Sequence, residues 1–131
     1  MKTSKILLID DEQWVRETIA MFLEFYGYSN IVQASDGQEG IRMIWQHKPD
    51  LVITDLTMPG IRGEEVIRWI SCEHKPAHPE IRVVALSADP EGTAEPAVRA
   101  AGADAFLSKP FQNDELKEAV EGLLAQAQVQ I

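Results

Sequence analysis

The sequence predicts a doubly wound α/β fold, in which helices cover both faces of a five-stranded parallel sheet of strand order 2-1-3-4-5. Five short apolar runs alternate with longer helical patterns along the chain, which is typical of this fold class. The total of 131 residues suits one domain with one core. Of the two common strand orders, five strands favour this one, in which ligands bind outside the carboxyl ends of the strands.

The strands are expected at residues 5–10, 30–35, 51–55, 81–87 and 103–108. The first, third and fourth of these are continuous apolar runs without the polar alternation of a half-exposed strand. We therefore expect helices on both sides of them, as in other parallel sheets.

A first helix is expected after Asp11, which is well placed to cap it. Apolar residues then recur at helical spacing until Gly27 ends the pattern. These residues are Val15, Ile19, Phe22, Leu23 and Tyr26.

Similar patterns predict helices at about residues 37–47, at about residues 63–72 and from Asn113 onward. The fourth helix is less regular, because Pro96 stands where an ordinary helix would already be running. Proline is tolerated only in the first turn of a helix. We therefore expect this helix to begin near Glu95, behind a longer and mobile loop.

The chain is expected to be a single domain over residues 1–131, with an ordered core at about residues 4–127. Residues 128–131 are expected to be a tail or the start of a linker. The apolar run near the N-terminus is too short for a signal peptide, and no stretch approaches the roughly 20 apolar residues of a membrane span. These observations favour an intracellular, cytoplasmic protein.

Charge limits the classes of partner. The chain has 12 Lys and Arg residues against 21 Asp and Glu residues, a formal net charge of −9. Such a surface repels the phosphates of nucleic acids and anionic membranes. We therefore expect no direct nucleic-acid partner and no membrane partner.

The remaining special residues have ordinary structural interpretations. A single cysteine, Cys72, excludes an internal disulfide. His74 and His78 lie in the Pro-rich stretch HKPAHP without a second pair of metal ligands, which favours a surface loop over a zinc site. The three tryptophans are expected in the partial core, at positions Trp14, Trp45 and Trp69.

Polar residues stand where the predicted strands end. The first strand ends in Asp10 and Asp11, the third in Asp55, the fourth in Ser87, and the fifth in Ser108 and Lys109. In the predicted strand order these strands are lateral neighbours, so their ends share one crevice. Taken singly, each residue could be a helix cap or an ordinary turn residue, and their joint placement is what indicates a site.

The chemistry of this cluster points to a metal ion and to phosphoryl transfer. Two carboxylates about 4 Å apart repel by about 4 kcal/mol at the dielectric of a protein surface. One lysine cannot neutralise three such groups, and oxygen ligands select a hard ion such as Mg²⁺ or Mn²⁺. A central carboxylate, Asp55, can then act as a nucleophile toward phosphorus, flanked by the metal and by Lys109.

Five motifs, in this order along the chain, resemble those of a known family: LLIDDE, ASDGQEG, VITDLTMPGIRG, VVALSA and AGADAFLSKPF. Together they make the chain similar to the receiver domains of two-component response regulators over its whole length. The resemblance implies a flavodoxin-like fold of the chemotaxis-regulator type. It also implies a phosphorylation-dependent switch, with Asp55 phosphorylated by a sensor histidine kinase or a histidine phosphotransfer protein.

The resemblance also implies the metal ligands. In the family, carboxylates at the positions of Asp11 and Asp55 and the main-chain carbonyl at Thr57 bind Mg²⁺ directly, while Asp10 acts partly through water. The family phosphorylates itself from small phosphodonors with Mg²⁺ and dephosphorylates itself, so it is a phosphoacceptor switch rather than an enzyme.

Residues of the other strands match further family positions. Lys109 would contact the phosphoryl group and precede a cis peptide bond to Pro110. Ser87 and Phe106 match the switch hydroxyl and the switch aromatic residue. The main-chain amide of Ala88 would reach the phosphoryl group.

Two variable family positions tune the lifetime of the phosphate, and they are Thr57 and Asp89 here. The partner beyond the donor is an unidentified target or output domain. Many members use the region of the fourth helix for targets or homodimers, and the Pro96 region departs from the usual pattern there.

Two alternative functions are weighed against the switch. A Mg²⁺-dependent phosphatase of the haloacid-dehalogenase type would need a second acid two residues after the nucleophile, where this chain has Thr57. A flavin or nucleotide module would need a Gly-rich or Ser/Thr-rich phosphate loop after the first strand, where this chain has carboxylates.

Overall fold

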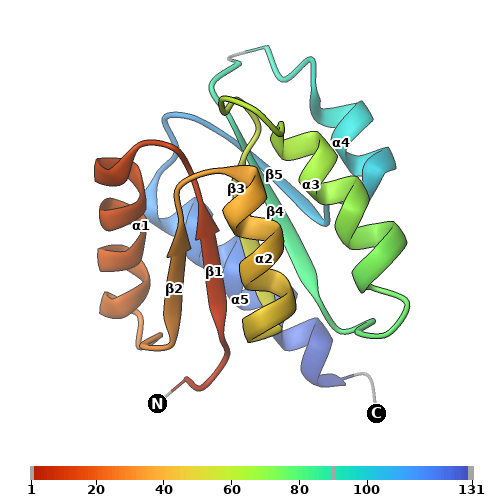
Figure 1. Cartoon of the computed structure of the whole chain (residues 1–131). Coiled ribbons are helices and arrows are strands. Elements are labelled where there is room, and N and C mark those ends of the chain that lie inside the picture. The colour runs from red at the N-terminus through yellow and green to blue at the C-terminus, as the bar shows by residue number, and fades with distance from the viewer. Residues whose placement is uncertain (1, 90, 130–131) are drawn as a thin grey trace.

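A computed structural model describes residues 2–89 and 91–129 and shows alternating strands and helices (Figure 1). The strands are β1 (Ile6–Ile9), β2 (Ile31–Ala34), β3 (Leu51–Asp55), β4 (Arg82–Ser87) and β5 (Ala105–Ser108). The helices are α1 (Gln13–Phe25), α2 (Gly37–His47), α3 (Gly63–Trp69), the π-helical turn η1 (Ile70–His74), α4 (Glu95–Ala101) and α5 (Asn113–Val129).

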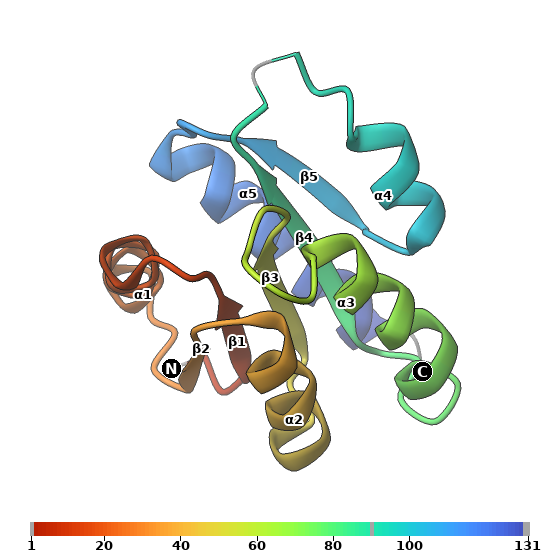
Figure 2. The same cartoon turned by 45° about the horizontal axis from the view of Figure 1, so that its top comes forward.

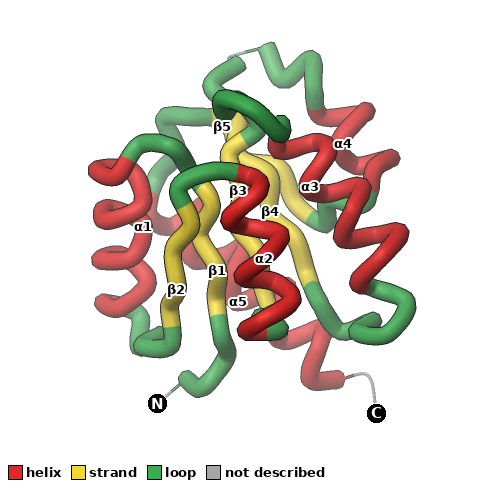
Figure 3. Tube along the Cα trace, viewed as in Figure 1, coloured by secondary structure: helices red, strands yellow, loops and turns green. Residues whose placement is uncertain are grey.

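All strands pair in parallel in the order β2-β1-β3-β4-β5, so the predicted fold class is confirmed (Figure 3). β1 lies between β2 and β3, with Ile9 opposite Ala34 on one side and Thr54 on the other. The carboxyl ends of the strands consequently meet at one edge of the sheet, at the top of Figure 1.

Two apolar layers hold the helices to the sheet. Figure 2 shows α1 and α5 on one face of the sheet and α2, α3 and α4 on the other. Ile6 and Leu8 of β1 pack in the layer of α1 and α5, whereas Leu7 and Ile9 pack in the layer of α2, α3 and α4. This division follows from the alternation of side chains along a strand. Burial of both faces of β1 explains why its sequence is continuously apolar.

The predicted helix boundaries are confirmed for α2, for the start of α4 at Glu95 and for the start of α5 at Asn113. Pro96 lies in the first turn of α4, where its missing N–H group has no helical partner to lose. The mobility of the preceding loop stays a prediction, since residue 90 lies outside the described residues.

One local prediction is wrong, and another is confirmed only in part. The N-cap of α1 is Glu12 rather than Asp11, and no side chain caps the helix there. The third helix does not continue regularly to residue 72, because it changes at Ile70 into η1, where Lys75 N–H donates to the carbonyl of Ile70 over 2.7 Å.

The aromatic residues are also placed differently from the prediction. Trp14 and Trp45 are 66% and 55% exposed, while Trp69 packs against the α2–α4 layer. His74 is buried in η1 rather than held in a surface loop, with 1% of its surface exposed. Its ring lies against the rings of Trp45, Trp69 and His78.

Gly63 brings the first turn of α3 against the end of β3. Its N–H group donates to the carbonyl of Leu56 over 3.2 Å. A side-chain carbon at this position would collide with the carbonyl oxygen of Asp55. The position therefore requires glycine because of a close backbone approach.

The C-terminal helix α5 extends to Val129, so the helix continues into the residues 128–131 that were expected to be a tail or a linker. Residues 130 and 131 lie outside the described residues. Within residues 2–89 and 91–129, none of the helices combines the length and the apolar character needed to cross a bilayer.

Candidate functional site

Three carboxylates meet where β1 and β3 end. One carboxylate oxygen each from Asp10, Asp11 and Asp55 lies within 4.8 Å of the others. Asp10 and Asp55 are 2% and 5% exposed, whereas Asp11 is exposed. Such a set of hard, anionic oxygen atoms fits a divalent ion that retains several water ligands, as Mg²⁺ does.

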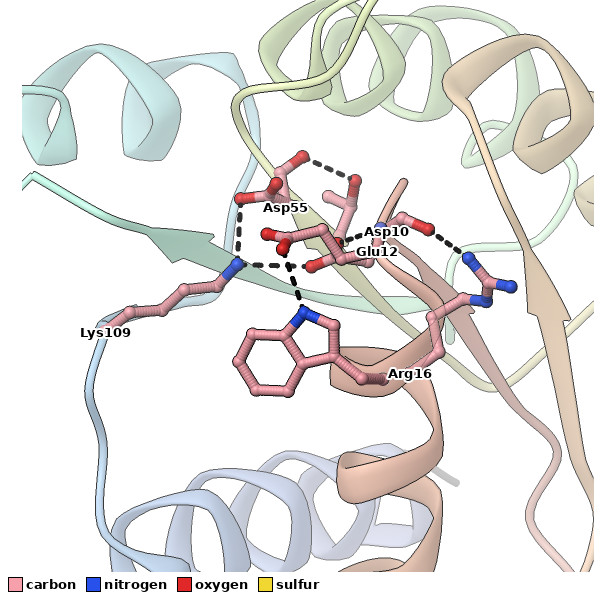
Figure 4. Close-up of polar contacts among 7 residues, drawn as sticks. Asp10, Glu12, Arg16, Asp55 and Lys109 are labelled. Atoms are coloured by element: carbon pink, nitrogen blue, oxygen red, sulfur yellow. Dashed lines mark hydrogen bonds and ion pairs between the residues drawn. The ribbon is translucent and has the colours of Figure 1, made fainter.

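Lys109 brings the only ammonium group that contacts this cluster within the described residues. Its Nζ atom lies 3.2 Å from Oδ2 of Asp10 and 3.4 Å from Oδ1 of Asp55 (Figure 4). The residue follows β5, and the peptide bond between Lys109 and Pro110 is cis. Residues separated by 99 positions in the chain are thus joined by the sheet topology.

Burial and charge together shift two pKa values in the cluster. Burial raises the pKa of Asp55 above its ordinary value, and the charge of Asp10 adds to this effect, while Lys109 opposes it. Burial by itself would lower the pKa of Lys109. The negative charges of Asp55 and Asp10 raise it by more than burial lowers it, so the net shift is upward. Burial rather than repulsion is thus the largest cause of the raised pKa of Asp55.

Asp10 is held by its backbone as well as by its carboxylate. Its N–H group donates to the carbonyl of Ala34 over 3.2 Å, and its Oδ1 atom accepts the N–H of Glu12 over 2.9 Å. Its carbonyl oxygen accepts a hydrogen bond from Nη1 of Arg16 over 2.6 Å (Figure 4). Sequence reasoning did not find Arg16, which looks like an ordinary polar residue of an amphipathic helix.

Ser87 and Asp89 lie together after β4. Ser87 is buried, and its hydroxyl oxygen accepts the N–H of Asp89 over 3.0 Å. The Asp89 carboxylate accepts hydrogen bonds from the N–H groups of Glu91 and Thr93 and from the Thr93 hydroxyl. The Thr93 hydroxyl, followed by these N–H groups, lowers the pKa of Asp89.

Three further expected site residues occupy the same edge or the strand beside it. Thr57 is exposed two residues after Asp55, and Ala88 is exposed directly after Ser87. Phe106 is half-buried on β5 and packs against the α2–α4 layer. The direct contacts of the cluster itself are made by the three carboxylates and Lys109.

Comparison with known proteins identifies the family. The sequence pattern of the response regulator receiver domain matches residues 6–121. The chain belongs to this family. The receiver domain is also 34% identical over 120 residues to the response regulator MprA of Mycobacterium leprae, and 35% identical over 120 residues to that of Mycolicibacterium vanbaalenii. It is thus a receiver domain of two-component response regulators, which act in phosphorylation-dependent signalling.

Solved structures agree with this assignment. A putative response regulator from Chloroflexus aurantiacus is 31% identical and superimposes with a TM-score of 0.87, over 95% of this chain and 99% of the other. The chemotaxis protein CheY4 of Vibrio cholerae is 24% identical, with a TM-score of 0.83 over 94% of this chain and 100% of the other, and shares the fold.

The alignment covers 92% of this receiver domain but 50% of each MprA relative. The chain thus spans about half the length of the curated relatives that it matches.

Proposed function

We propose that Asp55 is the phosphoacceptor of this receiver domain and takes its phosphoryl group from a histidine kinase or a histidine phosphotransfer protein. A carboxylate oxygen of Asp55 forms the new O–P bond while the P–N bond of the donor breaks, and its electron pair returns to the imidazole nitrogen. The observation that carries the proposal is the position of Asp55, which contacts Lys109 at 3.4 Å and lies in the carboxylate cluster.

We propose Mg²⁺ as the ion of this cluster, with Mn²⁺ as the alternative of similar ligand preference. Asp11 and Asp55 would bind it through their carboxylates and Thr57 through its main-chain carbonyl. Asp10 would contribute partly through water, because its carboxylate already contacts the Glu12 N–H group and the Lys109 ammonium. The bound ion would supply positive charge for the phosphoryl oxygens.

Lys109, Ser87 and the main-chain amide of Ala88 are proposed to contact the phosphoryl group from the other side. Lys109 already lies against Asp55, and a fixed ammonium there can stabilise developing negative charge on the transferring oxygens. Ser87 stands at the end of β4, the strand that pairs directly with β3. Its hydroxyl and the next amide therefore belong to the neighbouring strand end.

The switch is proposed to use Ser87 and Phe106. In this structure the Ser87 hydroxyl accepts the N–H of Asp89, and turning the hydroxyl toward a phosphoryl oxygen would give up this hydrogen bond. Phe106 would then turn inward and change the outer surface of the domain. Thr57 and Asp89 are proposed to tune the lifetime of the phosphate, since they flank the acceptor and the switch residue.

We propose that the donor protein docks on an apolar groove of the receiver domain, beside the carboxylate cluster. The groove has a volume of about 330 Å³ and lies between α1 and the segment after β5. Trp14 and Phe22 line one side, and Pro110 and Phe111 line the other. Because the groove also borders Lys109, a histidine-bearing segment seated there would lie close to Asp55.

The domain is proposed to act in the cytoplasm as one unit of residues 1–131. Its downstream partner is proposed to be an output domain, a separate target protein, or a second copy of the same domain in a homodimer.

The expectation of no nucleic-acid partner was too broad. It rests on the charge of this chain alone, and the chain spans 50% of its MprA relatives.

The intact mass after exposure to acetyl phosphate tests the proposal. With Mg²⁺, one phosphoryl group is expected on the wild-type protein and none on Asp55→Asn, and EDTA should prevent the addition. Beryllofluoride binding serves as the control for rapid hydrolysis of the phosphate. Absence of both the adduct and beryllofluoride binding in wild-type protein would refute Asp55 as an acceptor.

A further inference from the structure

Arg16 of α1 connects this helix to the backbone of Asp10 and to the side chain of Gln33 on β2. Its Nη1 atom donates to the carbonyl oxygen of Asp10 over 2.6 Å, and its Nε atom donates to Oε1 of Gln33 on β2 over 3.1 Å. Figure 4 shows the guanidinium group on the side of Asp10 that faces away from Lys109. A planar group with several N–H donors can make both contacts at once, which the single ammonium of lysine does less well.

The carbonyl that Arg16 binds lies in a very short connection. β1 ends at Ile9 and α1 begins at Gln13, so only residues 10–12 join them. The hydrogen bonds from Asp10 N–H to Ala34 and from Glu12 N–H to Oδ1 of Asp10 fix two groups of this connection. Arg16 fixes a third group, the carbonyl that immediately precedes Asp11.

Asp11 depends on this backbone more than the other two carboxylates do. Asp10 and Asp55 are buried and contact Lys109, whereas Asp11 is exposed. Within the described residues its carboxylate makes no hydrogen bond or ion pair, so its position relative to Asp55 depends on the backbone that carries it. A change in the backbone torsion angles of this connection that shifts the Cα atom of Asp11 would carry its carboxylate away from Asp55.

We infer that Arg16, supported by Gln33, is a positioning residue for the divalent ion: it orients the backbone of the β1–α1 connection so that Asp11 points at Asp55. The inference rests on the proposed function only in taking the carboxylate cluster as the metal site. Arg16 contacts the carbonyl of Asp10 and not the ion itself, so it acts through the geometry of the ligands.

Charge and geometry predict opposite effects of removing Arg16. The guanidinium is a cation near a site that binds a cation, so loss of its charge alone would strengthen Mg²⁺ binding. Loss of its hydrogen bonds would weaken binding, because Asp11 would no longer be held in place. The sign of the change in affinity therefore separates the two effects.

The test is the affinity of the full chain for Mg²⁺ by calorimetry, and for Mn²⁺ by the electron paramagnetic resonance signal of the free ion. Arg16→Met is expected to weaken binding about tenfold, at the lower end of the usual range for residues that hold metal ligands. Arg16→Lys keeps the charge, loses the planar pair of contacts, and should weaken binding by a smaller factor. Gln33→Ala removes one arm and should also weaken it.

The matched control is Arg42→Met on α2, because Arg42 is an exposed arginine whose nearest acidic contact is Glu39 at 3.9 Å. The metal affinity of Arg42→Met should equal that of the wild type.

Melting temperatures of Arg16→Met test for a purely structural role of Arg16. Such a role would lower the melting temperature equally in EDTA and in Mg²⁺. A positioning role should reduce the gain in melting temperature that Mg²⁺ gives.

Each outcome decides a different point. Wild-type protein that binds neither ion would refute the proposed metal site itself. If the wild type binds and Arg16→Lys, Arg16→Met and Gln33→Ala bind equally well, the inference is overturned while the metal site stands. Tighter binding by Arg16→Met would also overturn it, in favour of simple charge repulsion. If Arg16→Met does not fold, the affinities of Arg16→Lys and Gln33→Ala decide in the same way.

Discussion

Two buried polar regions of this receiver domain are stabilised in different ways. At the carboxyl edge of the sheet, the buried carboxylates of Asp10 and Asp55 each contact the ammonium of Lys109. At the far end of α3, His74 is equally buried, but neither ring nitrogen has a hydrogen-bond partner among the described residues. A buried charge needs a partner of opposite charge, whereas a neutral imidazole can be held by its aromatic neighbours.

The rings around His74 explain how this works. The ring stacks on Trp69 at 6.1 Å and on His78 at 4.5 Å, both at 24° between planes. The Trp45 ring meets it edge to face at 6.2 Å. Burial is the largest cause that lowers the pKa of His74, with His78 and Lys48 adding to it and Glu80 opposing it. The stack is therefore adapted to the uncharged ring.

The largest effect is expected from placing a permanent charge in this stack. His74→Lys would bury an ammonium without a carboxylate partner and should lower the free energy of unfolding by about 3 kcal/mol. Urea denaturation at neutral pH measures the loss. The matched control, Gln46→Lys, adds the same charge at an exposed position of α2 and should change stability little. Equal losses in both variants would contradict the difference between the two regions.

Removing the partner from the charged region should have a somewhat smaller effect. Lys109→Met leaves Asp10 and Asp55 buried without a cation, and we expect a loss of about 2 kcal/mol in EDTA, since Lys109 is partly exposed. The same denaturation experiment with Mg²⁺ should recover part of this loss. A variant as stable as the wild type in EDTA would show that the two carboxylates do not need Lys109.

A gain of about 1 kcal/mol is expected when the excess negative charge is reduced. Asp10→Asn leaves Asp55 paired with Lys109 and removes one source of repulsion. Its melting temperature in EDTA should rise, and its gain on adding Mg²⁺ should shrink. A lower melting temperature in EDTA would show that the hydrogen bond from Glu12 and the ion pair with Lys109 outweigh repulsion at Asp10.

The smallest effect concerns pH. The pKa of His74 is lowered in the folded chain from its ordinary value of about 6.5. When the pH falls below about 6.5, the unfolded chain therefore binds a proton at His74 that the folded chain does not yet bind. This contribution to stability is present above about pH 6.5 and is lost as the pH falls through the folded pKa.

His74→Phe keeps the aromatic packing without the titrating group. The melting temperature of this variant should therefore change less than that of the wild type between about pH 7.5 and about pH 5. Identical pH profiles would show that His74 is not the group responsible.

The two regions also differ in how far the sequence predicts them. The carboxylates and Lys109 stand directly after apolar strands, so the parallel topology alone brings them together. His74 gives no comparable signal, because HKPAHP has the composition of a loop, and neither the π-helical turn nor the aromatic stack follows from local periodicity. The contacts of Arg16 could not be predicted from the sequence either, since they depend on how α1 packs beside β2.

The close approach at Gly63 has a mechanical consequence. The first turn of α3 rests directly on the carbonyl of Asp55, and the N–H of Gly63 binds the carbonyl of Leu56. A displacement of the backbone at Asp55 is therefore expected to move the start of α3 with it, because no side chain separates the two segments. Lys109 follows β5 and Ser87 ends β4, so neither residue shares this backbone contact. The contact at Gly63 thus couples the end of β3 to the start of α3.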